Sequence, residues 1–223
     1  MELATGKGAS SVYLAKKFPD VAFYALNLAD GQLDIAKKKA CSVKNFYPDE
    51  GDYHDLSRYS TGSFDIVFIF DALCYSNDKG KVSEEVHRIL KPGGLFVVID
   101  GYSTRTDQDL TETELLGIHL MEKGMVVEKF EQYSKVKNDV LSKGFSIVSE
   151  EDTSTLILPS LYRFEVLAYR GFFKFPKLGK LLARILPQDF VNNAVSGYLM
   201  PILVQDKLVC YYITVFKKNS ANI

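Results

Sequence analysis

The stretch Glu2-Leu3-Ala4-Thr5-Gly6-Lys7-Gly8, followed by the segment 10–18, decides how this chain folds. Its apolar start predicts the end of a buried strand, and Gly6 and Gly8 predict a tight turn. A helix is expected next, because apolar residues recur there at helical spacing and should point inward: Val12, Leu14, Ala15 and Phe18. A glycine turn at a helix N-terminus gathers backbone N–H groups that suit an anionic or polar ligand group. Such turns also occur for purely structural reasons.

The rest of the chain alternates predicted strands with predicted helices. Strands are expected at 21–26, 43–47, 64–70 and 95–99, and helices from Asp30 to Ala40 and at 82–90, the second ended by the turn Lys91-Pro92-Gly93-Gly94. This alternation predicts right-handed crossovers and a parallel sheet with helices on both faces. Ligands of such sheets bind beyond the carboxyl ends of the strands. The residues that follow each predicted strand are therefore the ones to watch: 4–8, 27–28, 52–53, 71–75 and 100–102.

From Glu2 to Tyr102 these segments resemble the Rossmann-like (class I) methyltransferases that use S-adenosylmethionine. Glu2-x-Ala4-x-Gly6-x-Gly8 is similar to the family's glycine loop, with Ala4 in place of the first glycine. Asn27 stands where the family has an acidic residue that grips the ribose hydroxyls. Gly51-Asp52-Tyr53 matches the stretch whose Asp takes the adenine amino group. The most specific match is Arg88-Ile89-Leu90-Lys91-Pro92-Gly93-Gly94-Leu95, the turn into the fifth strand.

The resemblance implies a fold, a cofactor and a domain plan. The expected fold is α/β, three-layered and Rossmann-like, with a mostly parallel seven-stranded sheet, an antiparallel last strand near 207–216 and a helical cap insertion. Residues 1–223 would form a single methyltransferase domain, with 1–102 as the cofactor-binding half and 103–143 and 155–202 as the cap. The cofactor would be S-adenosylmethionine, released as S-adenosylhomocysteine. Its implied ligands are Glu2, Ala4, Thr5, Gly6, Gly8, Asn27, Leu28, Asp52, Tyr53, Asp71 and Ala72.

The candidate catalytic residues are Tyr75, Asp71 and His119. The sulfonium of the cofactor is already a good electrophile, so the protein mainly aligns the acceptor and excludes water. A base is needed for a hydroxyl or an unactivated carbon, but not for a neutral amine. Tyr102 and Tyr198 are further candidates for the acceptor pocket.

Two alternatives come from the same residues. Gly6-x-Gly8-x-x-Ser11 is one residue away from a dinucleotide-binding fingerprint, but Asn27 is not the acidic residue that such a site needs. Ala4 and Asn27 also allow a relative that binds the cofactor without catalysis and acts as a binding or regulatory subunit. We prefer an active methyltransferase to both.

The insertion between the last two strands has an unusual composition. Segment 162–187 holds six basic residues and one acid, Glu165, interleaved with aromatic and aliphatic residues. A basic amphipathic stretch suits an amphiphilic acceptor or an anionic membrane surface. The simpler interpretation, which we favour from the sequence, is that the aromatic residues close the pocket while the cations face water. The acceptor is expected to be small and apolar or amphiphilic.

Composition sets the remaining expectations. The 223 residues are 47% hydrophobic and 25% charged with a net charge of −1, so a general nucleic-acid binder is not expected. Cys41, Cys74 and Cys210 have no metal-type spacing, which favours free thiols, no metal site and a reducing compartment. Without a membrane-spanning run or signal peptide, we expect a cytoplasmic protein. Because a strand usually has about 5–6 residues, part of the first strand and any helix before it are expected to be missing.

Overall fold

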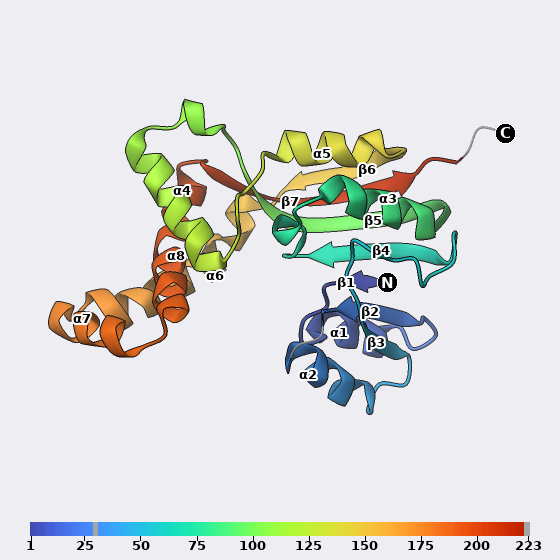
Figure 1. The fold of residues 1–223 in the computed structure, drawn as a ribbon, viewed down its shortest axis with the longest axis horizontal. Coiled ribbons are helices and arrows are strands. Elements are labelled where there is room, and N and C mark those ends of the chain that lie inside the picture. Colours follow the sequence, from blue (N-terminus) through green and yellow to red (C-terminus); the bar gives the residue numbers. More distant parts are fainter. Residues whose placement is uncertain (29–30, 221–223) are drawn as a thin grey trace. The chain divides into compact units, whose positions relative to one another are not determined.

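The computed structural model describes residues 1–28 and 31–220 (Figure 1). Its strands are β1 (Glu2–Leu3), β2 (Phe23–Asn27), β3 (Phe46–Glu50), β4 (Phe64–Phe70), β5 (Leu90–Ser103), β6 (Phe145–Asp152) and β7 (Val209–Lys218). Its α-helices are α1 (Ala9–Lys17), α2 (Gly31–Ala40), α3 (Lys79–Ile89), α4 (Glu112–Met125), α5 (Tyr133–Ser142), α6 (Ser154–Ala168), α7 (Pro176–Ile185) and α8 (Gln188–Gln205). Short 3₁₀ turns lie at Leu73–Tyr75 and Asp107–Asp109, and a π-helical turn lies at Tyr169–Phe173.

The sheet has seven strands in the order β3-β2-β1-β4-β5-β7-β6, in a three-layer Rossmann-like α/β fold. Strands β1 to β5 pair in parallel, with Glu2 opposite both Ala25 and Phe68. The last strand is antiparallel, since the N–H of Asn219 donates to Gly144 at one end while that of Thr153 donates to Tyr211 at the other. The order reverses at β1, so the carboxyl ends of β1 and β4 flank the switch point where ligands bind in open α/β sheets.

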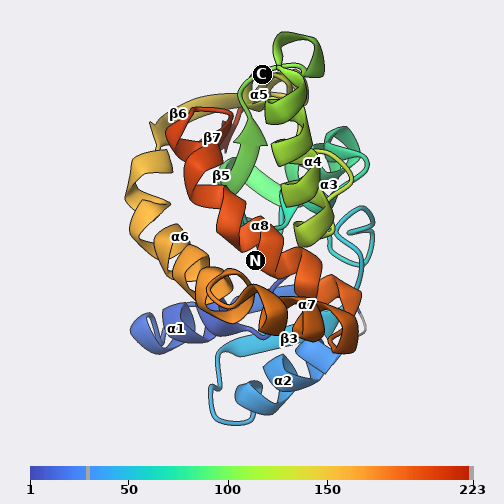
Figure 2. The ribbon, with the colours of Figure 1, turned by 90° about the vertical axis from the view of Figure 1, so that its left-hand side faces the viewer.

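The chain separates into two compact units, which we describe individually. The first holds the described residues of 1–100, 136–150 and 213–223, and the second holds 101–135 and 151–212. In the first unit, α1 and α2 pack on β2 and β3 through a core cluster of Ala15, Phe23, Ala25, Ala36, Val43 and Phe46. The second unit is mainly helical, with α8 packed against both α4 and α6 (Figure 2). In the described part of the chain, no helix has the length and apolar character needed to cross a membrane.

Several predicted elements are confirmed and a few positions are corrected. The strand over Phe64–Phe70 is confirmed in full. The predicted helix start at Asp30 lies outside the described residues, and the helix that is described begins at Gly31. The prediction that Phe18 points inward is wrong: this residue is exposed and follows the last turn of α1. The third strand runs over Phe46–Glu50 rather than 43–47, because Val43 lies in a turn: its N–H donates to the carbonyl oxygen of Ala40, and its own carbonyl oxygen accepts from the N–H of Phe46.

The segment Lys91-Pro92-Gly93-Gly94 lies within β5 instead of forming a separate turn before it. The pairing of β4 with β5 shifts between Phe64, opposite Leu90, and Ile66, opposite Leu95. The extra residues therefore form an irregularity in the ladder. At Gly94 a Cβ would lie 2.9 Å from the carbonyl oxygen of Lys91, so a side chain does not fit there.

Candidate active site

The loop after β1 is built from left-handed backbone positions. Ala4 and Gly6 have φ of 54° and Gly8 has φ of 70°. Gly8 is the N-cap of α1, and a Cβ there would lie 2.9 Å from Cζ of Phe46. Within the described residues, no side chain caps this helix end, and its first turn holds no acid. The helix N-terminus therefore presents backbone donors and a positive dipole end to a polar or anionic group.

Glu2 is buried beneath this loop and stabilises it. Its Oε2 accepts hydrogen bonds from the hydroxyls of Thr5 and Ser11, so one carboxylate joins the end of β1, the loop and the first turn of α1. Burial raises the pKa of Glu2, although these hydrogen bonds oppose the shift. Ser11, the last residue of the pattern Gly6-x-Gly8-x-x-Ser11 that is close to a dinucleotide-binding fingerprint, is fully buried here.

Asn27 joins three of the predicted binding loops. Its Oδ1 accepts a hydrogen bond from the N–H of Gly6 at 2.9 Å, and its main-chain oxygen accepts one from the N–H of Gly51 at 2.9 Å. Its Nδ2 donates to the carbonyl oxygen of the exposed Leu28 at 3.2 Å. Because Gly51 directly precedes Asp52, the glycine loop, the end of β2 and the loop after β3 meet around this residue.

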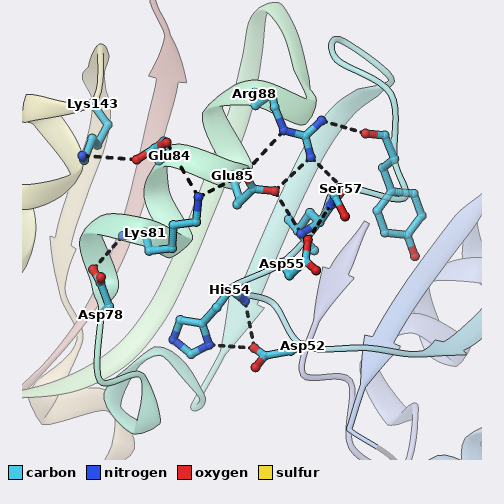
Figure 3. A network of polar contacts seen from close by, with 12 residues as sticks. Asp52, His54, Asp55, Ser57, Asp78, Lys81, Glu84, Glu85, Arg88 and Lys143 are labelled. Carbon is cyan, nitrogen blue, oxygen red and sulfur yellow. Dashed lines mark hydrogen bonds and ion pairs between the residues drawn. The ribbon is translucent and has the colours of Figure 1, made fainter.

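Asp52 and His54 form a hydrogen-bonded chain that reaches the turn after β4. Figure 3 shows the contacts between Asp52 and His54. The Oδ1 of Asp52 lies 2.6 Å from Nδ1 of His54 and also accepts its main-chain N–H at 2.8 Å. The Nε2 of His54 lies 2.8 Å from Oγ of the buried Ser76. In parallel, the hydroxyl of Tyr53 donates to the carbonyl oxygen of Ala72 at 3.3 Å. The loop after β3 is thus tied twice to the turn after β4.

The carboxyl group of Asp52 stays ionised at neutral pH. Partial burial on its own would raise the pKa, but the hydrogen bonds and charge of His54 outweigh it and hold the pKa below its ordinary value of 3.8. Both contacts with His54 use Oδ1, and no contact within the described residues uses Oδ2 of this half-exposed side chain. Asp52 is therefore able to accept a hydrogen bond from a ligand.

Helix α3 holds the loop that follows Asp52 (Figure 3). The Oε2 of Glu85 accepts hydrogen bonds at 2.9 Å from the N–H of Leu56 and from Nη2 of Arg88. Arg88 also donates to the carbonyl oxygens of Leu56 and Tyr59, both at 2.7 Å. The helix begins at the side chain of Asp78, which caps the N–H of Lys81. Residues 55–59 are thus fixed by charged groups of one helix.

The turn after β4 places Asp71, Ala72 and Tyr75 together. Asp71 is exposed and has φ of 50°, and its N–H donates to the carbonyl oxygen of Ile99. Ala72 is buried, and the N–H of the neighbouring Cys74 donates to Oδ2 of the buried Asp100 at 2.9 Å. Burial, with the negative groups nearby, raises the pKa of the half-exposed Tyr75 to about 12. At neutral pH this phenol is a hydrogen-bond donor and not a base.

The structure brings most of the predicted residues to one edge of the first unit, and His119 belongs to the second unit. His119 is exposed on α4. The ring of Tyr102 packs on that of Tyr133, with 5.1 Å between the ring centroids. The ring of Tyr198 packs on that of Phe173, with 4.6 Å between the centroids. Among the described residues, no group of three or more His, Cys, Asp or Glu side chains is placed to hold a metal ion.

Sequence reasoning missed Ser76 at this edge, and it included Asp100 only within the segment 100–102 that was expected to follow a strand. Both are buried, and each fixes the turn after β4 through a partner distant in sequence. One sequence signal for this chain of contacts is the spacing Asp52-x-His54. A carboxylate two residues before a histidine is able to accept the histidine N–H in an Asx-type turn and to contact the imidazole ring. Nothing in the sequence points to Ser76.

The part of the chain that holds these loops matches a family of known proteins. Residues 1–98 match the family described as methyltransferase domain. Sterol methyltransferase-like 2 of Botryococcus braunii is 27% identical over 176 residues, which is 75% of this chain and 45% of that protein. Sarcosine/dimethylglycine N-methyltransferase of Aphanothece halophytica is 30% identical over 132 residues, 56% of this chain and 46% of that protein. The chain thus spans less than half the length of these curated relatives.

A solved structure shares the fold over nearly the whole chain. Geranyl diphosphate C-methyltransferase from Streptomyces coelicolor A3(2), solved with Mg²⁺, geranyl diphosphate and S-adenosyl-L-homocysteine, superposes with a TM-score of 0.74 at 12% identity, covering 97% of this chain and 71% of that one. Residues 1–98 match the methyltransferase-domain family, and the fold of the chain is that of the Rossmann-like (class I) S-adenosylmethionine-dependent methyltransferases.

Proposed function

We propose that this chain binds S-adenosylmethionine at the carboxyl edge of β1 to β4 and transfers its methyl group to a small, apolar or amphiphilic acceptor. The observation that carries the proposal is the junction at Asn27, where the glycine loop, the end of β2 and the loop before Asp52 are joined by two 2.9 Å hydrogen bonds. The relatives named for sterols, sarcosine and geranyl diphosphate support a small acceptor.

The residues present fit such a cofactor. The left-handed loop Ala4–Gly8 leaves no room for a side chain at Gly8, and α1 begins there without a side-chain cap. We assign the loop to the amino-acid end of the cofactor, Asn27 and Leu28 to the ribose, and Asp52 with Tyr53 to the adenine. The amide of Asn27 both donates and accepts, but it lacks the charge-assisted strength of a carboxylate. Glu2 and Thr5 act by holding the loop, with Ala72 and Asp71 closing the edge after β4.

The bound cofactor supplies an electrophilic methyl group on its sulfonium. The protein then has to orient the acceptor and keep water away from it. We assign the orienting hydrogen bond to Tyr75, whose pKa of about 12 keeps it protonated. Asp71 is the proposed proton acceptor at this turn, and His119 is the proposed base where the acceptor is a hydroxyl or an unactivated carbon.

Calorimetric titration with S-adenosylhomocysteine tests the binding site. Asp52→Ala and Asn27→Ala should each weaken binding about ten-fold, the effect of one lost hydrogen bond of about 1.4 kcal/mol. The matched control is Asp49→Ala, an exposed carboxylate on β3 paired with Arg58, which should bind like the wild type. If both site variants keep the wild-type affinity, the assignment of this edge is wrong.

Transfer of a labelled methyl group tests the reaction. A sterol, sarcosine and an isoprenoid diphosphate represent the acceptor classes named for the relatives and solved structures. We expect transfer to one of them, and slower turnover in Tyr75→Phe with unchanged cofactor affinity. Tight cofactor binding with no transfer to any acceptor would contradict the activity and favour a non-catalytic relative.

A further inference from the structure

Helix α7 exposes an apolar face to solvent. Leu178, Leu181 and Ile185 are 48%, 54% and 66% exposed, and their spacing places them on one side of the helix. Phe175, one turn earlier, is also exposed and continues the row. We call Phe175, Leu178, Leu181 and Ile185 the apolar row. Large aliphatic side chains at this spacing normally face a core, so the row needs a partner.

The packing face of α7 is a different one. Gly179 is buried, and a Cβ there would lie 1.9 Å from the carbonyl oxygen of Phe172, so the helix is seated against the π-helical turn at Gly179. Leu182 and Ala183 are partly buried on this side. The apolar row is therefore not the side by which α7 attaches to its own unit.

Basic side chains flank the apolar row. Lys177, Lys180 and Arg184 are all exposed on α7. Over residues 162–187 the only acid is Glu165, against six cations: Arg163, Arg170, Lys174, Lys177, Lys180 and Arg184. A helix with an exposed apolar face beside a cationic face is the form that lies in a membrane interface and is attracted by anionic lipids.

An apolar cavity adjoins the same helix. It has a volume of about 340 Å³ and lies between the π-helical turn, α7 and α8. Its lining is almost entirely apolar: Phe172, Phe173, Pro176, Gly179, Lys180, Ala183, Val191, Ala194 and Val195. A cavity of this kind, on the side of α7 that holds Gly179 and Ala183, has room for part of a hydrocarbon chain.

We propose that α7 docks this protein on an anionic lipid surface, with the apolar row in the acyl boundary and Lys177, Lys180 and Arg184 against the head groups. Two partners fit such a face, a second copy of this chain and an anionic lipid surface, and charge favours the lipid surface. A second copy would bring a second set of six cations against the first, which repel, whereas anionic head groups complement them. The interpretation favoured from the sequence assigns the aromatic residues of 162–187 to the pocket and the cations to the solvated face; the exposed aliphatic residues of the row favour the lipid surface instead.

Vesicle flotation of the full chain tests the proposal. The wild type should float with vesicles of equimolar phosphatidylcholine and phosphatidylserine, and binding should fall with added salt. Lys177→Glu/Lys180→Glu should reduce the partition coefficient about 25-fold or more, from roughly five-fold per basic side chain near an anionic surface. Leu181→Glu should reduce it about ten-fold, because a leucine no longer enters the interface.

Two matched controls separate this surface from general charge and hydrophobicity. Lys37→Glu/Lys38→Glu on α2 makes the same change of net charge at exposed positions, and Leu116→Glu changes an exposed leucine of α4. Both should bind vesicles like the wild type. Failure of the wild type to float overturns the proposal, as does an equal loss in the controls. So does a concentration-dependent dimer that Leu181→Glu dissociates, which would assign the row to a second copy. None of these readouts depends on methyl transfer.

Discussion

In the first unit, the loops after β1, β2, β3 and β4 are joined to one another by hydrogen bonds, whereas residues 154–205 of the second unit expose a row of apolar side chains. Asn27 and His54 each link two loops of the first unit. In the second unit, α7 is attached at Gly179 and leaves Leu181 and Ile185 exposed. The same chain thus combines loops that are fixed by hydrogen bonds with an exposed apolar surface, for which we propose a lipid partner.

The fixed character of the loops predicts high sensitivity to the α3 network. Arg88→Ala removes donors to two carbonyl oxygens and to Glu85, whose side chain is only 10% exposed. Leaving a buried carboxylate without this partner should lower the free energy of unfolding by about 3 kcal/mol. Denaturant unfolding measures the change. The control is Arg58→Ala, which breaks the exposed pair with Asp49 and should cost less than about 1 kcal/mol. Equal losses would refute a special role for Arg88.

The glycine loop should respond nearly as strongly to one added methyl group. Gly8→Ala puts a side chain into a left-handed position, at 2.9 Å from the ring of Phe46, and should cost about 2 kcal/mol. Gly62→Ala has a similar φ of 67° with no atom within 4 Å of the new Cβ, and should cost about 1 kcal/mol. The difference in thermal unfolding between these variants isolates the close contact. If Gly62→Ala costs as much, the space around Gly8 is not limiting.

These residues also show how far the sequence leads. The strand over Phe64–Phe70 and the positions of Gly6, Asn27 and Asp52 at or just after the ends of their strands follow from local pattern, because periodicity and turn chemistry are local. The contact of His54 with Ser76 joins residues 22 positions apart, and no local rule predicts it. The orientation of Leu181 depends on which side of α7 fits against the π-helical turn. Gly179 decides that through a contact that a sequence pattern does not contain.

The stability that Glu85 contributes to the α3 network should depend on pH. Its hydrogen bond with Arg88, opposed in part by burial, holds its pKa below the ordinary value of 4.5. A carboxylate with a depressed folded pKa stabilises the protein above its unfolded pKa, and this stability is lost as the pH falls through the folded value. At neutral pH, Glu85→Gln should therefore be less stable by about 1.5 kcal/mol, and the difference from the wild type should narrow below pH 4.5. Unfolding curves at several pH values measure it. A constant difference would mean that the carboxylate charge does not matter here.

The smallest effect on stability is expected on the exposed side of α7. Ile185→Ser removes an apolar side chain that is 66% exposed, and serine and isoleucine have similar helix propensities, so unfolding should change by less than about 0.5 kcal/mol. Leu203→Ala on α8, a residue only 4% exposed, should cost about 3 kcal/mol in the same measurement. If Ile185→Ser instead destabilises the protein as much as Leu203→Ala, the side chain supports the fold. If stability is unchanged while vesicle binding falls, the side chain of Ile185 contributes to lipid binding and not to the fold.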